Sequence, residues 1–394
     1  MAPNSTSTAA SMSDRRAVLA ALLSLTALPA LAAEDGSRVE PVALPFAVKA
    51  MRGPGSDVAL SVATSGLLPV ARAPAGASAD PKSTGNTAPP SVVVVWGEGG
   101  GAVLSLEGDR LRTTLIGAEA IEGFAAAETP RGAVPGSRRA LDGPLSAYLT
   151  GPTRALGGAP GQGTVLTVRE RQPLGVTAEP KAVPVTTQTL APGDGRVFAG
   201  RTPHITRLDG RPAVAAVTAQ GPAVSGLAVA AKGMDGVWTL RAQTPPQAGK
   251  GPEGAPLALA AIADFTGTGT GQPQIAAIRA PDGEGVLQLW RIADGTLSLA
   301  GEAPGYAGPA AGETADLAAP VPRGGGAPPD LALPVAGRGA VAVVSLKGGS
   351  PVERARLPLP APAAHGVAVL DAGGTAKTIL IGLADGRLVA VSAP

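Results

Sequence analysis

The chain has 394 residues, 44% of them hydrophobic, with 32 basic and 30 acidic side chains and no cysteine. The lack of cysteine excludes disulfides, thiolate metal sites, thioether-bound haem and cysteine nucleophiles. The two signs of charge nearly balance, basic residues form no long run, and aromatic residues are few, so we expect no nucleic-acid partner.

Residues 1–33 have the pattern of a secretory signal peptide. Arg15 and Arg16 precede an apolar run over 17–28, which ends in an Ala-x-Ala sequence before residue 33. The arginine pair resembles the twin-arginine export signal, and an ordinary basic segment of the general secretory pathway is the alternative. Met12 is an alternative start. The apolar stretch is short for a membrane span, so we expect cleavage, no stable membrane insertion, and a periplasmic or secreted product.

The rest of the chain, 34–394, repeats one pattern six times: a Gly/Pro-rich turn, a short apolar strand, a turn and a second apolar strand. Small strands repeated about every 50 residues are typical of a propeller or a solenoid. The first strands are expected at 57–62, 144–149, 212–217, 273–278, 330–335 and 377–382, and their partners at 92–96, 164–168, 236–240, 286–290, 340–346 and 386–391.

The clearest repeat contains four strands, at 256–263, 273–278, 285–290 and 295–299, which together make one propeller blade. We therefore predict an all-β propeller of about six four-stranded blades in a single domain, with five or seven left open. The last repeat supplies three strands, so we expect segment 37–42 to pair with 387–391 and close the ring. The Ala/Pro/Ser/Gly-rich segment around 67–90 is predicted to be a disordered surface loop.

Asp264, the Gly-rich turn after it and the following Pro-x-Ile/Ala strand resemble the FG-GAP/VCBS repeat of integrin-type β-propellers. Weaker copies occur at 325–333, 208–217 and 141–149. The resemblance implies a propeller used for interaction, with an Asp-rich loop that binds calcium in the family. Here Thr266, Thr268 and Thr270 stand where further carboxylates would be needed, and calcium prefers several carboxylate ligands. We expect no cofactor, with calcium at Asp264 as the alternative. Asp264 and Asp209 are expected to bond to their own turns.

Four side chains are candidates for a site in the central channel: His204, His365, Asp209 and Asp371. Each histidine is expected near the start of an inner strand, at matching repeat positions, with an aspartate a few residues later. They could serve as metal ligands or as acid and base, but two histidines without a third ligand make a poor zinc site. The alternative, which we favour, is two idle loop positions that match because the repeats are related.

Two further groups of residues are expected to be structural. Trp96, Trp238 and Trp290 are predicted on third strands, where a large ring would fill the space between neighbouring blades. Arg138 and Arg139 are predicted to be solvated at a strand end.

The sequence favours a non-catalytic binding or scaffold propeller that binds an envelope protein or a small ligand. We expect it to act as a monomer. A propeller-type hydrolase, lyase or quinoprotein is the alternative. Such enzymes need several acidic, basic and aromatic side chains at one point, and the chain has only two histidines and two tyrosines.

Overall fold

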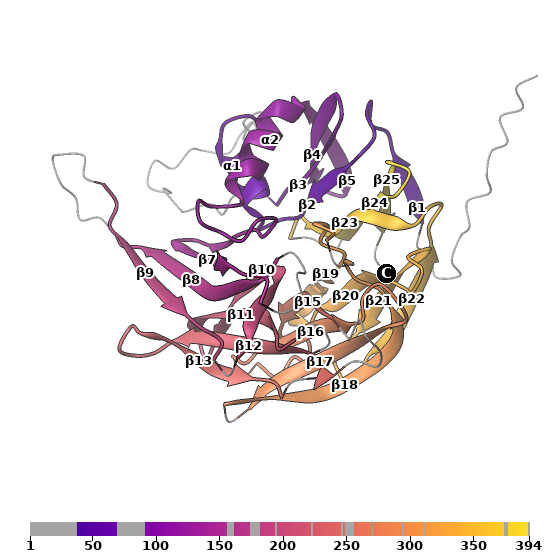
Figure 1. Cartoon of the computed structure of the whole chain (residues 1–394). Helices are drawn as coiled ribbons and strands as arrows, with labels where there is room; N and C mark the ends of the chain where they lie inside the picture. Colours follow the sequence, from indigo (N-terminus) through magenta and orange to yellow (C-terminus); the bar gives the residue numbers. More distant parts are fainter. Residues whose placement is uncertain are drawn as a thin grey trace, which may run out of the picture. The chain divides into compact units, whose positions relative to one another are not determined.

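Short antiparallel strands joined by tight turns make up most of the chain in the computed structural model (Figure 1). The structure describes residues 38–68, 91–155, 161–173, 182–193, 195–221, 224–245, 247–248, 256–269, 271–293, 295–310, 312–373 and 377–392. The chain divides into two units, Met1–Ala30 and Leu31–Pro394, and all the described residues belong to the second. The expected signal peptide at 1–33 and most of the expected loop around 67–90 lie outside the described residues.

The described residues form six four-stranded antiparallel blades, as the sequence predicted: four are separate sheets, and blades 2 and 3 are joined in one nine-stranded sheet through the pairing of Phe198 with Gly163. Blade 1 contains β2 (Ala50–Arg52), β3 (Val93–Gly97), β4 (Gly100–Glu107) and β5 (Arg110–Ile116). Blade 2 contains β6 (Ala140–Asp142), β7 (Leu145–Pro152), β8 (Gly163–Arg171) and β9 (Val185–Leu190). Blade 3 contains β10 (Val197–Leu208), β11 (Arg211–Ala219), β12 (Val224–Lys232) and β13 (Trp238–Gln243), with β14 (Gln247–Ala248) beside β12.

Blades 4 and 5 are each formed by four consecutive strands, and blade 6 takes its fourth strand from the other end of the chain. Blade 4 contains β15 (Leu257–Ala263), β16 (Gln274–Arg279), β17 (Gly285–Ala293) and β18 (Thr296–Tyr306). Blade 5 contains β19 (Ala319–Val321), β20 (Asp330–Pro334), β21 (Ala340–Ser345) and β22 (Val352–Pro358). Blade 6 contains β23 (Ala363–Asp371), β24 (Lys377–Leu383), β25 (Leu388–Ser392) and β1 (Val39–Val42).

The pairing of β1 with β25 closes the ring, which confirms the expected closure. Val39 lies opposite Val391 and Val42 opposite Leu388. The inner strands of successive blades also contact one another: β6 meets β10, and the series continues through β15, β19 and β23 to β2. Sheets that share an axis in this way, each too thin to form a core alone, make a β-propeller.

One predicted strand is wrong: residues 57–62 lie in helix α1 (Asp57–Thr64), not in a strand. The Ser56 hydroxyl caps the helix by accepting a hydrogen bond from the Ala59 amide, which satisfies a free amide of the first turn. Val58 and Val62, four residues apart, are both fully buried, which is the spacing of one helix face. A second helix, α2 (Ala118–Ala127), follows β5, and no helix in the described ranges is long and apolar enough to cross a membrane.

The other five strands predicted first in the repeat pattern are real, and each is the second strand of its blade, as expected for 273–278 in the clearest repeat: β7, β11, β16, β20 and β24. These strands lie inside their sheets, so most of their residues are buried on both faces and their sequences are largely apolar. The inner strands β6 and β19 are only three residues long and carry more mixed sequences. Burial on both faces explains why the second strands dominate the sequence pattern.

The three tryptophans are buried as expected, but the predicted third-strand position holds for only one of them. Trp96 is on β3, Trp238 on β13 and Trp290 on β17, and at most 8% of any of these residues is exposed. Trp238 packs with residues of blades 2 and 3, and Trp290 with residues of blades 3 and 4. Trp96 instead packs against both helices. The large rings thus fill the junctions between layers of small Ala and Val side chains.

Candidate functional site

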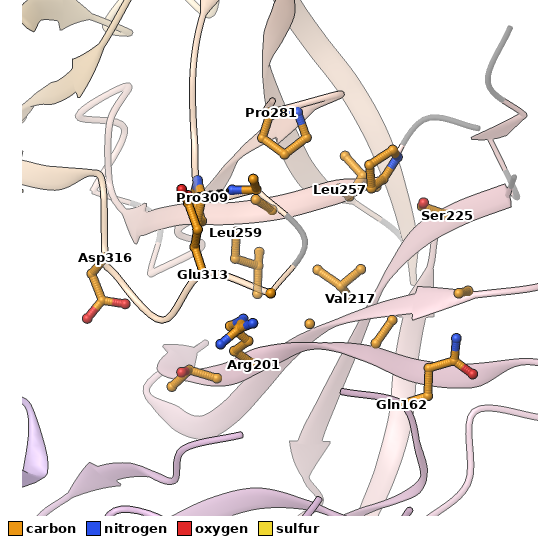
Figure 2. Close-up of a pocket in the computed structure, with 18 of the residues that line it drawn as sticks. Gln162, Arg201, Val217, Ser225, Leu257, Leu259, Pro281, Pro309, Glu313 and Asp316 are labelled. Atoms are coloured by element: carbon orange, nitrogen blue, oxygen red, sulfur yellow. Dashed lines mark hydrogen bonds between the residues drawn. The ribbon is translucent and has the colours of Figure 1, made fainter. Parts of the chain in front are cut away.

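A cavity of about 380 Å³ lies between the inner parts of blades 3 and 4, as Figure 2 shows. Its walls come from β10, β11 and β15 and from the segment that joins β18 to β19. Val217, Leu257, Leu259 and Pro281 supply apolar surface, and charged side chains gather at one end. This size and this mixture of an apolar wall with a few polar groups are typical of a small-molecule site.

An irregularity in β10 brings its side chains to the cavity. The strand pairs with β11 up to Ala199 and again from His204, so four residues of β10 bypass one residue of β11. Gly200 begins the bypass with a φ of 86°, a conformation that favours glycine. Arg201, Thr202 and His204 all line the cavity as a result. A bulge of this kind changes the direction of side chains within a strand.

An ion pair between Arg138 and Asp316 crosses the axis of the propeller. Arg138 precedes β6 of blade 2 and Asp316 precedes β19 of blade 5, and these blades face each other in a ring of six. Arg138 Nη1 lies 3.0 Å from one carboxylate oxygen of Asp316, and its Nη2 bonds to the other. The Arg138 amide donates to the Arg201 carbonyl at 2.7 Å, and the Asp316 carbonyl accepts from the Val367 amide at 2.7 Å.

The prediction that Arg138 and Arg139 are solvated is therefore wrong. Only 9% of the Arg138 side chain is exposed, and Arg139 Nε lies 2.5 Å from a carboxylate oxygen of the buried Asp57. Burial alone raises the pKa of Asp316, but the charge and hydrogen bonds of Arg138 outweigh it and hold that pKa below its ordinary value. The carboxylate is thus ionised at neutral pH, and the pair carries no net charge.

A second ion pair at the charged end of the cavity joins Glu313 to Arg338. The Arg338 guanidinium donates to both Glu313 oxygens, at 2.9 and 2.7 Å, and to the Gly308 carbonyl at 2.6 Å. The hydrogen bond from Arg338 is the main reason that the pKa of Glu313 is lowered. This pair is also neutral overall.

Arg201 differs from the other cations of the site. Among the described residues, no side chain or carbonyl forms a hydrogen bond or ion pair with its guanidinium, although it lines the cavity beside Glu313 (Figure 2). Burial and the nearby charge of Arg138 lower its pKa, against the attraction of Glu313. An arginine in a protein stays charged even so. The cavity therefore has one positive charge that no bond within the described chain balances.

Three polar atoms that line the cavity are buried and hydrogen-bond to no described group: Arg138 Nε, Gln162 Oε1 and Thr202 Oγ1. Gln162 as a whole is only 6% exposed. Buried polar atoms in folded proteins nearly always have a partner, because losing water without gaining a bond costs about 1–3 kcal/mol. Their collection around one cavity indicates a place for a polar ligand.

A second cavity, of about 540 Å³, extends from the Arg138–Asp316 pair toward blades 1 and 6. Thr202 and His204 line both cavities. Burial is the main cause that lowers the pKa of His204, with the charge of Arg138 acting in the same direction and that of Asp316 opposing. His204 is therefore neutral at pH 7 and sits next to the ion pair.

The pKa of His204 predicts how stability depends on pH. Because the folded-state pKa is lowered, the unfolded chain takes up the proton first, so the free energy of unfolding falls as pH drops below about 6.5. Burial also lowers the pKa of His365, and the chain has no other histidine. We expect wild-type protein to lose stability between pH 7 and pH 5, and His204→Gln with His365→Gln to flatten this part of the profile. Urea unfolding at each pH measures it, and a wild-type profile already flat in this window would contradict the prediction.

The other three channel candidates do not join His204 at these two cavities. His365 bonds to the backbone of Lys49. Asp209 lies in the turn after β10, where its amide donates to the Gly271 carbonyl at 3.0 Å. Asp371 ends β23 and accepts from the Gly373 amide at 2.7 Å and from Lys377. The structure thus places one of the four candidates at the site and three in turns or strand ends.

The carboxylate of Asp264 accepts hydrogen bonds from three backbone amides of its own turn, as expected. The donors are the amides of Gly267, Thr268 and Gly269, at 2.8, 3.3 and 3.0 Å. Within the part of the chain that the structure describes, no three acidic or histidine side chains come together as a metal site would require. The hydrogen bonds of Asp264 are explained by turn geometry.

The sequence pattern does not indicate most of the site: Gln162, Arg201, Glu313 and Asp316 are not among the predicted site residues, and Arg138 is predicted in the wrong surroundings. One signal exists for Arg201, because it directly follows Gly200 in a strand that carries the candidate His204, and a glycine inside a strand often marks a bulge. Asp316 and Glu313 lie in an irregular Ala/Gly-rich segment whose path no strand pattern predicts.

Comparisons with known proteins give structural neighbours only. No family model matches the chain, and no curated protein does. One structural neighbour belongs to the S. cerevisiae complex of Dbp5 bound to Nup159, Gle1, IP6 and ADP, at 14% identity, with 76% of this chain and 73% of that chain covered and a TM-score of 0.35. Another is a fucose-specific lectin from Aleuria aurantia, at 12% identity, with 77% and 86% covered and a TM-score of 0.35. What these proteins bind does not transfer to this chain at such distances.

Proposed function

We propose that this chain is a non-catalytic binding propeller that is exported through a signal peptide at 1–33 and holds a small ligand in the cavity between blades 3 and 4. The mature protein would comprise residues 34–394, act as a monomer in the periplasm or outside the cell, and need no bound metal. A relation to the FG-GAP/VCBS propellers remains part of this proposal.

One observation carries the proposal: the Arg201 guanidinium lines a cavity of about 380 Å³ and has no bonding partner among the described residues. Arg201 is partly exposed, so its guanidinium keeps N–H donors that face the cavity and fit the oxygens of an anionic ligand group. The electrostatics of the site are otherwise balanced by the pairs Arg138–Asp316 and Glu313–Arg338.

Binding fits the site better than catalysis. Hydrolases and lyases need a nucleophile or base with a second group that orients it within hydrogen-bond reach. His204 is the candidate base at the cavity, and its main neighbours are the already paired Arg138 and Asp316. The carboxylates Glu313 and Asp316 are both held by arginines, which keeps them from taking up a proton near neutral pH.

The proposal predicts that Arg201→Ala abolishes ligand capture. The mature protein is incubated with a small-molecule extract of the cell envelope, washed, and examined by native mass spectrometry for a bound compound. Arg207→Ala is the matched control, because Arg207 lies on the same strand but is 60% exposed and pairs with Asp142 at the surface. We expect one compound on wild type and on the control and none on Arg201→Ala. Capture of nothing by wild type, or equal capture by all three, would overturn the proposal.

A further inference from the structure

The charges around the cavity limit the ligand to one class. Arg138 with Asp316, and Glu313 with Arg338, each form a pair of zero net charge. His204 is neutral, because burial lowers its pKa. The lining side chains Arg138, Arg201, Glu313 and Asp316 carry two positive and two negative charges, and Arg338, which bonds to Glu313 without lining the cavity, leaves the group one positive charge in excess. A monoanion balances this charge, whereas a dianion or a cation would leave a net charge at the site.

The geometry of an arginine narrows the anion further. A guanidinium presents parallel N–H groups that match two oxygens of a carboxylate or a phosphate, and this bidentate contact is stronger than a neutral hydrogen bond. Of these two groups the carboxylate carries a single charge at pH 7, whereas a phosphomonoester carries about −1.5 to −2. The adjoining Thr202 hydroxyl, buried and without a described partner, adds a donor at the same end.

The end of the cavity away from Arg201 fits a neutral polar group of the ligand. Figure 2 shows Gln162 and Arg201 well apart, with Val217 between them. Gln162 is 6% exposed, and its Oε1 is buried without a partner. Leu257, Leu259 and Val217 line the space beside these two ends. A hydroxyl on the ligand suits this end, since it can accept from the amide nitrogen of Gln162 or, with the amide turned over, donate to its oxygen.

We infer that the cavity binds a small organic monocarboxylate whose apolar body separates the carboxylate, at Arg201, from a neutral hydroxyl at Gln162. The inference rests on the proposed function and specifies its ligand class. A cavity of about 380 Å³ accommodates a single-ring or short branched acid, at the lower end of the usual size of ligand sites.

Three related probes test each end of this ligand separately: 3-(4-hydroxyphenyl)propanoate, the corresponding amide, and 3-phenylpropanoate. Isothermal titration calorimetry at pH 7.5 gives the dissociation constant of each for the mature protein. We expect the hydroxy acid to bind at least about tenfold more tightly than its amide, the range of a charge-assisted bond, and about two- to tenfold more tightly than the acid without the hydroxyl.

Two variants show which residue causes each difference in dissociation constant. In Arg201→Gln the acid and the amide should bind equally, while the effect of the hydroxyl remains. In Gln162→Leu the effect of the hydroxyl should vanish, while the preference for the acid remains. Arg207→Gln on the same strand should behave as wild type. If Arg201→Gln fails to fold, Arg201→Lys serves instead. It keeps the positive charge but lacks the two parallel N–H groups of the guanidinium, so it should retain only part of the preference for the acid.

The outcomes separate this inference from the proposed function. Equal binding of acid and amide to wild-type protein, or no binding of any probe at about 10 mM, a concentration at which even millimolar affinity is detected, would overturn the inference about the ligand class. If the compound captured from the envelope extract is neutral or cationic, this inference fails while the binding function stands. If no compound is captured and no probe binds, both fail.

Discussion

Replacing Glu128 by glutamine is expected to lower the free energy of unfolding by about 3–5 kcal/mol, because it leaves a buried arginine without its counter-charge. The side chains of Arg52 and Glu128 are 7% and 3% exposed, and Arg52 Nε lies 2.9 and 3.2 Å from the two carboxylate oxygens. The arginine also bonds to the Met51 carbonyl and lies 5.4 Å from the centre of the Trp96 ring. Urea unfolding of the mature protein measures the loss.

The exposed pair Glu107–Arg112 supplies the matched control, since its side chains are 62% and 45% exposed. Glu107→Gln should cost less than about 1 kcal/mol, as exposed ion pairs do. The double variant Arg52→Met with Glu128→Leu should lose less than Glu128→Gln alone, because it removes both charges together. Equal losses for Glu128→Gln and Glu107→Gln would contradict the prediction.

The pair Arg52–Glu128 lies at the junction between blades 1 and 2. Arg52 ends β2, the inner strand of blade 1, and Glu128 follows α2 on the way to blade 2. Close by, Asp57 of α1 pairs with Arg139, which immediately precedes β6. The junction between blades 1 and 2 is thus held by two partly or fully buried ion pairs, whereas the junction of blades 3 and 4 is a cluster of Ala, Val, Leu and Ile side chains with one tryptophan.

Deletion of residues 38–44, which removes β1, is expected to lower the free energy of unfolding by about 3–5 kcal/mol. The strand contributes a four-residue ladder to β25, at about 1 kcal/mol for each hydrogen bond, and partial burial of Val39 and Val42. These two side chains pack against different core clusters, Val39 with blades 5 and 6 and Val42 with blades 6 and 1. Removing the strand therefore opens the ring and loosens two junctions.

The same deletion should increase the tendency of the protein to self-associate. β25 becomes an edge strand whose backbone groups are free to pair with another copy. Size-exclusion chromatography with light scattering detects this, and a synthetic peptide of residues 37–45 added in trans should restore the monomer. Glu40→Gln is the control, because Glu40 is exposed on the same strand. An unchanged unfolding midpoint after the deletion would refute the role of β1 as the closing strand.

The sequence alone determined the architecture. Second strands such as β3, β16 and β24 are buried on both faces, so apolar runs mark the blades in the sequence. The missing strand of the last repeat indicates closure by the N-terminal strand. The strand predicted at 57–62 is a helix, because a short run of Val, Ala and Leu fits either element and only the Ser56 cap distinguishes them locally.

Which residues form the site was decided only by the tertiary structure. Arg138, Arg201 and Asp316 lie far apart in the sequence and outside the regular part of the strand pattern, and they meet because blades 2, 3 and 5 converge on one axis. Whether an arginine is solvated, paired or left facing a cavity depends on what the other blades place beside it. Local sequence has no information on such neighbours, because periodicity reports which face of a strand is buried and not which charge it meets there.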